Sequence, residues 1–355
     1  MSDPDLVRRP LDTLPKAHLH LHFTGSMRHA TVIGLAAEQG LRLPEALTTE
    51  WPPALSGGDE RGWFRFQRLY DVARSVLRTA PQVRRLVLEA AEDEAAEGSR
   101  WLELQVDPSG YAARFGGITA FTDLVIDASR EASAASGVEV SLIIAANRTR
   151  HPLDARTLAR LATQYAGRGV VGFGLSNDER RGDARSFARA FDLAERAGLL
   201  SAPHGGELAG AESIWACLDV LHAGRIGHGV RSVEDPDLMS WLADRQITLE
   251  VCPLSNVGLG VYPDAGAVPL RTLFDAGVPL ALGADDPLLF GSRLVAQYQV
   301  ARDVHGFSDA ELAELARMSV RGSTAPPAVR ARLLAEIDTW LATPPPAPPG
   351  PPEFA

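Results

Sequence analysis

His18-Leu19-His20-Leu21-His22 is the stretch that decides the fold, because it alternates strictly between histidine and leucine. In a β-strand, residues two apart point to the same side, so all three imidazoles would face one way. Three buried histidines are costly without a partner, and a metal ion is the natural one. The stretch therefore predicts a strand that carries metal ligands.

Seven further short runs of β-branched or apolar residues follow along the chain, separated by amphipathic helical stretches. Such runs are typical of strands buried on both faces of a parallel sheet. Eight strand–helix units favour a closed barrel over an open sheet, so we predict a single (β/α)8 TIM barrel of the α/β class with extra C-terminal helices. The predicted strands are His18–Phe23, Trp101–Asp107, Val138–Asn147, Val170–Ser176, Leu200–His204, Arg225–Gly229, Ile247–Cys252 and Pro279–Gly283.

One long segment interrupts this repeat between the first and second strands, from about Leu41 to Ser99, and it contains the aromatic helix Trp63–Tyr70. In a barrel, an insertion after a strand lies on the C-terminal face, where active sites are found. We therefore predict one barrel domain over residues 1–342, with residues 41–99 as a helical insertion or lid. The proline-rich residues 343–355 cannot form a helix or central strand, and we expect a disordered tail.

The composition limits the class of protein. The chain has 355 residues of which 45% are hydrophobic, enough to bury a large core. A net charge of −10 argues against a general nucleic-acid or membrane-surface binder. With two cysteines, no signal-peptide core and no apolar run of membrane-spanning length, we expect a cytoplasmic protein that acts on a small molecule. Its oligomeric state stays open.

Polar clusters end three of the later predicted strands. Because the carboxyl ends of barrel strands meet at one rim, these clusters should lie beside His20 and His22, with His18 nearer the core. Nitrogen and carboxylate ligands with an open water position are typical of catalytic zinc, so we predict His20, His22, His204 and Asp285 as ligands. Glu207 and His228 remain as general acid and base candidates. The clusters are His204-Gly205-Gly206-Glu207, Gly227-His228-Gly229 and Gly283-Ala284-Asp285-Asp286-Pro287.

Lys16 is the only lysine, and it precedes the histidine strand. Many two-metal hydrolases on this barrel bridge their metals with a modified lysine at the end of the fourth strand, which here ends in Ser176-Asn177. A lysine-bridged pair is therefore excluded. We expect one Zn²⁺ or another divalent transition metal, and a carboxylate-bridged pair stays open. The cysteine-based zinc deaminase motif and a phosphate-binding P-loop are both absent.

From about Leu14 to Ile337 the chain resembles the adenosine deaminase family of the amidohydrolase superfamily. The motifs that carry the resemblance are Pro15-Lys16-Ala17-His18-Leu19-His20-Leu21-His22, His204-Gly205-Gly206-Glu207, Arg225-Ile226-Gly227-His228-Gly229, Val251-Cys252-Pro253 with Ser255-Asn256, and Asp285-Asp286-Pro287.

This resemblance implies a role for each matching residue. His20, His22, His204 and Asp285 would bind one zinc ion. Glu207 would protonate purine N1, His228 would orient and deprotonate the attacking water, and Asp286 would hydrogen-bond N7. Asn177 stands where the family usually places a glycine whose backbone donates to N3.

Thr24 departs from the family, which usually has an aspartate there that accepts a hydrogen bond from the ribose 5′-hydroxyl. Losing that bond costs roughly 1.5–3 kcal/mol for adenosine, whereas a substrate with an anion at the 5′ end would gain. Here the chain resembles actinobacterial aminodeoxyfutalosine deaminases of menaquinone biosynthesis. We therefore expect 6-amino-6-deoxyfutalosine as substrate, with Phe66 as an apolar wall and Arg68 or Arg65 as the carboxylate ligand.

Three alternatives stay open. The first is an adenosine deaminase that tolerates threonine at position 24. The second is a metal-dependent amide or ester hydrolase on the same barrel, although Glu207 and Asp286 suit a purine better. The third is a zinc-binding protein without catalysis.

Overall fold

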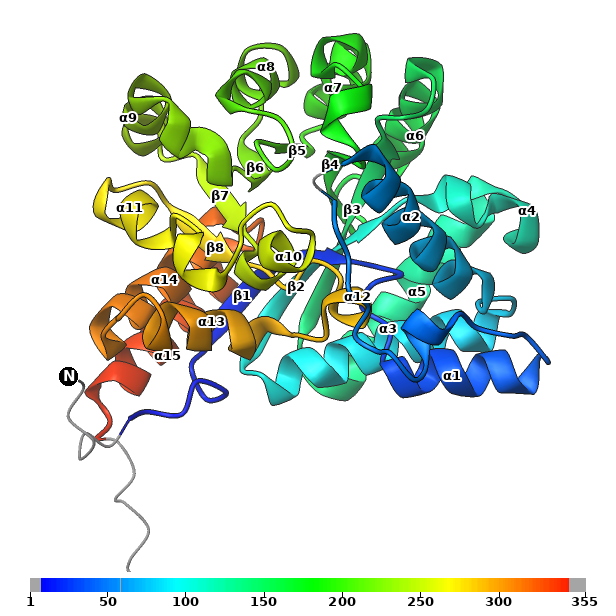
Figure 1. Ribbon diagram of the computed structural model, residues 1–355, viewed down its shortest axis with the longest axis horizontal. Coiled ribbons are helices and arrows are strands. Elements are labelled where there is room, and N and C mark those ends of the chain that lie inside the picture. Colours follow the sequence, from blue (N-terminus) through cyan, green and yellow to red (C-terminus); the bar gives the residue numbers. More distant parts are fainter. Residues whose placement is uncertain (1–7, 58, 345–355) are drawn as a thin grey trace, which may run out of the picture.

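Eight parallel strands follow one another around a common axis in the order of the chain (Figure 1). The computed structural model describes residues 8–57 and 59–344. All eight predicted strands are present, and every neighbouring pair from β1 to β8 is parallel. The strands are β1 Lys16–His22, β2 Ser99–Val106, β3 Glu139–Asn147, β4 Val170–Ser176, β5 Leu200–Gly205, β6 Arg225–His228, β7 Thr248–Val251 and β8 Leu280–Leu282.

The last strand returns to the first and closes the barrel. The backbone N–H of His22 donates to the carbonyl of Asp285 at 2.9 Å, and the N–H of Asp285 donates to the carbonyl of His20 at 3.0 Å. This short parallel bridge just beyond β8 joins two predicted ligand segments directly. The predicted TIM barrel is thus confirmed, and the closure itself brings the site together.

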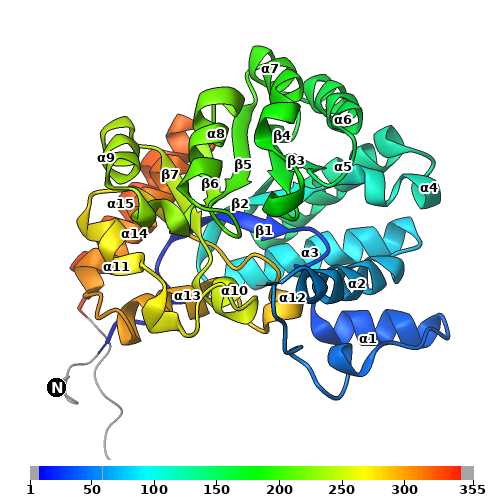
Figure 2. The same ribbon diagram turned by 45° about the horizontal axis from the view of Figure 1, so that its top comes forward.

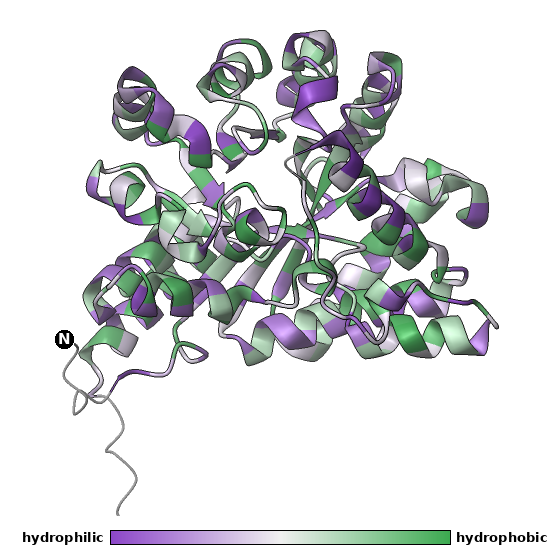
Figure 3. Cartoon of the chain, viewed as in Figure 1, coloured by the Kyte–Doolittle hydropathy of each residue, from purple (hydrophilic) through white to green (hydrophobic). Residues whose placement is uncertain are grey.

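Helices surround the strands on the outside (Figures 1 and 2). Along them, hydrophobic and hydrophilic residues are interspersed (Figure 3), as expected for helices with one buried face and one exposed face. The helices are α1 His29–Glu38, α2 Glu60–Ser75, α3 Ala80–Ala96, α4 Ala112–Phe115, α5 Ile118–Ser136, α6 Pro152–Gln164, α7 Ala188–Arg196, α8 Ala211–Leu221, α9 Pro236–Arg245, α10 Pro253–Gly258, α11 Leu270–Asp275, α12 Pro287–Phe290, α13 Leu294–Asp303, α14 Asp309–Gly322 and α15 Pro327–Ala342.

The segment predicted as one insertion, residues 41–99, divides into two parts. Helix α3 packs against β2 and α5, so it belongs to the outer wall of the barrel. Helix α2 instead lies beside α12 at the mouth, where Phe66 stacks on Phe290 with ring centroids 6.0 Å apart. Its start is defined by Asp59, whose side chain accepts from the N–H of Gly62 at 2.7 Å. Of these two parts, α2 is therefore the one that lines the cavity, and its action as a lid stays a prediction.

The C-terminal helices complete the outer layer. Helix α14 packs against β1 and β8, which makes it the eighth wall helix, and α15 packs on α14. The predicted tail at residues 343–355 lies almost entirely outside the described residues. No helix among the described residues is both long and apolar enough to cross a membrane.

Candidate active site

The three histidines of β1 have separate environments. His18 uses both ring nitrogens inside the barrel, Nδ1 with Glu94 at 2.7 Å and Nε2 with the N–H of Ala284 at 2.9 Å. His20 uses only Nδ1, which lies 2.6 Å from a carboxylate oxygen of Glu250, and its buried Nε2 has no hydrogen-bond partner. His18 is therefore a structural residue, whereas His20 presents a free nitrogen toward the mouth.

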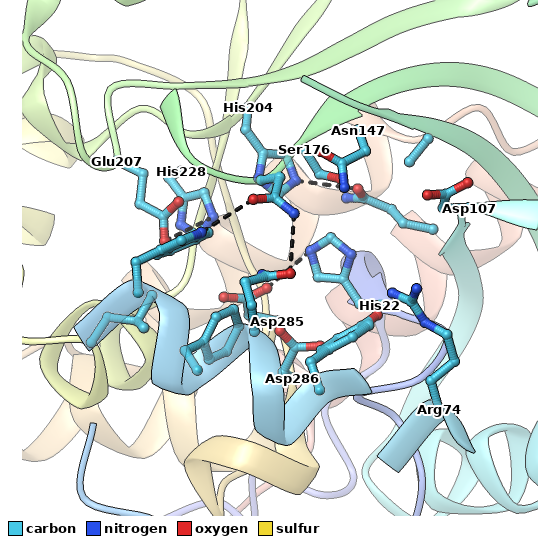
Figure 4. A pocket seen from close by; sticks show the side chains of 18 residues that line it. His22, Arg74, Asp107, Asn147, Ser176, His204, Glu207, His228, Asp285 and Asp286 are labelled. Carbon is cyan, nitrogen blue, oxygen red and sulfur yellow. Dashed lines mark hydrogen bonds and ion pairs between the residues drawn. The ribbon is translucent and has the colours of Figure 1, made fainter. Parts of the chain in front are cut away.

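The predicted ligand residues converge at the carboxyl ends of their strands, and His22, His204 and Asp285 are seen together in Figure 4. Ligand atoms of His20, His22 and His204 all lie within 4.8 Å of one another. An Asp285 carboxylate oxygen lies 3.1 Å from Nε2 of His22 and 3.5 Å from Nε2 of His20. These are the types of donor that zinc and similar divalent metals bind.

The surrounding residues support a metal at this cluster. Glu250 fixes the His20 ring so that Nε2 faces the other ligands, as outer carboxylates do for metal-bound histidines. Ser255 donates to the second oxygen of Asp285 at 2.5 Å. An orphaned, fully buried His20 Nε2 is costly unless a ligand pairs with it. The residues present thus fit a divalent metal ion.

The Gly227-His228 turn places a fourth histidine over the cluster. A Cβ at Gly227 would lie 2.7 Å from the His204 ring and 3.0 Å from the His20 ring, so the packed imidazoles leave room only for glycine. The next residue, His228, adopts φ 62°, a left-handed conformation that non-glycine residues adopt rarely. This geometry brings His228 to the cluster.

His228 and Glu207 lie next to each other on one side of the site (Figure 4). Nε2 of His228 lies 3.7 Å from a carboxyl oxygen of Glu207, and both side chains are buried. Burial, with the charge of His20 adding to it, lowers the pKa of His228 to about 4. Burial and the neighbouring Asp285 carboxylate raise the pKa of Glu207 well above its usual range. A neutral imidazole and a protonated carboxyl are the states that a base and an acid require.

Asp286 contributes a second buried carboxyl on the other side of the cluster. Its Oδ1 has no hydrogen-bond partner, and burial together with the Asp285 charge raises the pKa of Asp286 to about 7. Gly25 allows this placement, since a Cβ there would lie 1.8 Å from Oδ1 of Asp286. The cavity thus contains two raised-pKa carboxyls, Glu207 and Asp286, that flank the ligand cluster.

Asn177 occupies the left-handed conformation, with φ 82°, at the position where the resemblance led us to expect a glycine. Asparagine tolerates this conformation better than most residues. Its side chain accepts from Nε1 of Trp63 at 3.1 Å and donates to Gln67 at 3.1 Å. Two residues of α2 are therefore tied to the end of β4.

Thr24 is buried and is not among the residues that line the cavity. Its hydroxyl is hydrogen-bonded to the hydroxyl of Tyr111. Tyr70 belongs to the cavity wall, next to Phe66 of the same helix. The position after the histidine strand is thus occupied by a hydroxyl pair, and a direct substrate contact by Thr24 stays a prediction.

The two arginines that we predicted as carboxylate ligands lie elsewhere. Arg65 and Arg68 are on the exposed face of α2, and Arg68 borders a separate surface depression. Arg74 lines the cavity instead, and its guanidinium lies over the rings of Tyr70 and Tyr111. Helical spacing could have identified it, because position 74 follows 63, 66, 67 and 70 on one face.

The chain as a whole is similar to known proteins. The family model described as adenosine deaminase matches residues 15–340. The chain belongs to the adenosine deaminase family. Its members are metal-dependent hydrolytic deaminases, and the cluster described above has donor atoms that could hold such a metal ion, so the ligand set stays a prediction.

Several relatives cover nearly the whole chain. A Streptomyces virginiae protein named "Putative adenosine/adenine deaminase" is 65% identical over 94% of this chain and 98% of its own. A Streptomyces coelicolor protein of the same name is 63% identical over 94% and 98%. A second S. coelicolor protein, named aminodeoxyfutalosine deaminase, is 36% identical over 96% and 88%. The crystal structure of adenine deaminase from Arthrobacter aurescens has a TM-score of 0.86 at 31% identity, covering 93% of this chain and 99% of that one.

Metal content is a direct test of the ligand set. We expect the His20→Ala variant to lose stoichiometric metal and the thermal stability that metal binding provides, because one of its few ligands is gone. Elemental analysis of the purified protein and a melting curve with added zinc measure both. The matched control is His151→Ala, which alters an exposed histidine. Full metal occupancy in the His20 variant would contradict the assignment.

Proposed function

We propose that the chain catalyses the zinc-dependent hydrolytic deamination of a 6-aminopurine, releasing ammonia and the 6-oxo purine. The observation that carries the proposal is the pair of raised-pKa carboxyls, Glu207 and Asp286, on opposite sides of the ligand cluster. A 6-aminopurine presents ring nitrogen acceptors on both sides of C6, N1 and N7. Protonated carboxyls are hydrogen-bond donors and match both acceptors.

Each residue has one task in this reaction. His20, His22, His204 and Asp285 would hold the zinc ion, which would supply the Lewis acid that makes water nucleophilic at neutral pH. His228, neutral at pH 7, accepts the proton of the attacking water. Glu207 donates its proton to N1, so that the negative charge that develops on the ring is neutralised. Asp286 donates to N7 and orients the base.

The N9 side of the purine decides which substrate fits, and we propose free adenine as the first candidate. On the ring, N9 lies between N3, which faces Asn177, and N7, which faces Asp286. Side chains of α2 lie near both residues. Trp63 and Gln67 are hydrogen-bonded to Asn177. Burial raises the pKa of the Tyr70 phenol, and the charge of the nearby Asp286 raises it further. This crowding supports a base with no large N9 substituent.

The names of the relatives also support adenine as the first candidate substrate. The solved adenine deaminase is 31% identical and aligns over nearly its full length. S. coelicolor has an aminodeoxyfutalosine deaminase at 36% identity, beside a distinct protein that is 63% identical to this chain. Of these two S. coelicolor proteins, the one more similar to this chain is named a putative adenosine/adenine deaminase, and the less similar one is named an aminodeoxyfutalosine deaminase.

Aminodeoxyfutalosine is the second candidate substrate, and one observation favours it over adenine. Adenosine, whose N9 substituent is smaller, lies between the two in size. The Arg74 guanidinium reaches the cavity, and its buried Nε has no hydrogen-bond partner. Its nearest carboxylate is the exposed Asp71, 3.4 Å away. A cation between two tyrosine rings would suit a carboxyphenyl group.

Steady-state kinetics separate the three substrates. We expect kcat/KM for adenine to exceed that for adenosine and aminodeoxyfutalosine by about 10-fold or more, because α2 crowds N9. The loss of 6-aminopurine absorbance measures all three. If aminodeoxyfutalosine has the highest value, the second candidate replaces the first. If none of the three is deaminated by zinc-loaded protein, the proposed reaction itself is wrong.

The Arg74→Met variant tests whether Arg74 binds a substrate carboxylate, whichever of the three substrates has the highest kcat/KM. If Arg74 binds an anionic N9 extension, its loss should raise KM for aminodeoxyfutalosine about 10- to 100-fold while KM for adenine stays unchanged, since a charge-assisted bond is lost. The matched control is Arg68→Met, on the exposed face of the same helix. An equal change for both substrates would show that Arg74 only supports α2.

A further inference from the structure

Glu179 is a buried carboxylate that lies under the segment carrying Glu207. It follows β4 in the short 3-10 helix Glu179–Arg181, and its residue exposure is 6%. One oxygen accepts from the N–H of Gly206 at 2.7 Å and from the hydroxyl of Ser213 at 2.7 Å. The other accepts from the N–H groups of Glu207, Leu208 and Ala209 at 2.7, 2.5 and 3.1 Å.

Four consecutive N–H groups thus converge on one side chain. Successive backbone N–H groups form a concave anion-binding site, and such sites usually hold a ligand or a phosphate. Here the anion is part of the chain itself. The pKa of Glu179 is lowered despite its burial, with the charge of Arg148 and the hydrogen bonds of Ser213 and the backbone as the causes. The carboxylate is therefore ionised and fills its own site.

The same segment is held from the other end. Arg148, buried after β3, donates to the carbonyl of His204 through one guanidinium nitrogen and to that of Gly182 at 3.3 Å through another. Between these two anchors lies the stretch from His204 to Ala209. Its middle contains two glycines, which hold the backbone only weakly on their own. The conformation that aims Glu207 at the cluster must come from outside the segment.

We propose that Glu179 is a positioning residue that sets the orientation of Glu207 by binding the backbone N–H groups of residues 206–209. This inference rests on the proposed role of Glu207 as proton donor. Glu179 touches neither the substrate cavity nor the ligand cluster, because its two oxygens are directed to the backbone and to Ser213. Its effect should appear in the step that Glu207 performs, with substrate binding left almost unchanged.

Glu179→Gln is the direct test, because an amide keeps the volume but replaces one acceptor oxygen with a donor. We expect amide hydrogen exchange across residues 206–209 to become faster. We expect kcat for adenine to fall about 10- to 100-fold, the scale for a catalytic group displaced by about 1 Å. KM and the metal content should stay near those of the parent protein, which a general loss of folding would not allow.

Glu212→Gln is the matched control, since this exposed carboxylate accepts only one N–H of the same loop, that of Gly210, at 3.3 Å. It should leave exchange and kcat unchanged. Glu179→Asp provides a second variant should the glutamine variant not fold, and its shorter carboxylate should give the same pattern in weaker form. Unchanged exchange, or faster exchange with unchanged kcat, would overturn the proposal. The exchange measurement does not depend on turnover, so it stands apart from a failure of the proposed reaction.

Discussion

Replacing Glu207 by glutamine is expected to lower kcat/KM for the 6-aminopurine substrate about 10²–10⁴-fold, the usual contribution of a general acid. Glutamine keeps the size and the hydrogen-bond donor near N1, but it has no acidic proton to transfer. Burial and the neighbouring Asp285 raise the pKa of the Glu207 carboxyl, which favours the protonated form that a general acid requires. Steady-state assays with saturating zinc measure the loss.

Two measurements keep this result interpretable. The metal content of Glu207→Gln should equal that of the parent protein, because Glu207 is outside the proposed ligand set. Substrate binding, followed under conditions without turnover, should weaken far less than kcat. If activity falls less than about threefold, Glu207 is not the proton donor, because even weak general acid catalysis exceeds that factor.

Replacing Arg225 by methionine should destabilise the protein by about 3–5 kcal/mol, since breaking a buried ion pair leaves uncompensated charge. Arg225 is 1% exposed at the base of the site and lies between two carboxylates, Glu103 and Glu250, which are both fully buried. It also donates to the carbonyl of Gly322 at 2.9 Å. Without it, two buried anions face each other, and Glu250 is the partner of His20.

Urea unfolding of the metal-saturated protein measures this loss. Arg130→Met is the control: Arg130 is 63% exposed, its partner Asp127 is also exposed, and such pairs contribute about 0–1 kcal/mol. The Arg225 variant should also bind zinc more weakly, because the Glu250 that orients His20 is no longer neutralised. A change in stability as small as that of the control would show that the ion pairs of Arg225 with the two carboxylates do not stabilise the fold.

The barrel and the ligand cluster could be predicted because they follow from local pattern. The alternation around His20 is a property of any strand, and the polar residues that end β5, β6 and β8 must share one rim once the barrel closes. Asp286 and Glu207 also follow strand ends, so the same argument predicts that they lie at this rim. None of these inferences required knowledge of which loops lie near each other.

The wall of the cavity could not be predicted in the same way. Arg65, Arg68 and Arg74 all belong to one amphipathic helix. Helical spacing groups Arg74 with the aromatic face, but only the docking of α2 over the mouth decides that this face lines the cavity. Glu179 and Glu250 were also missed, because each acts on a residue far from it in sequence: Glu179 on residues 206–209 and Glu250 on His20. A buried carboxylate gives no local signal of its partner.

By itself the sequence determined the architecture and the meeting of the predicted metal ligands and the predicted acid–base pair at one end of the barrel, because strand periodicity and the parallel order of a barrel convert positions along the chain into one shared rim. Only the tertiary structure decided what surrounds that rim. It turned Arg74 rather than Arg68 into the cavity, placed the Thr24 hydroxyl against Tyr111, and put Glu179 beneath the backbone that carries Glu207. These contacts depend on how a helix docks and how loops meet, and long-range packing sets both.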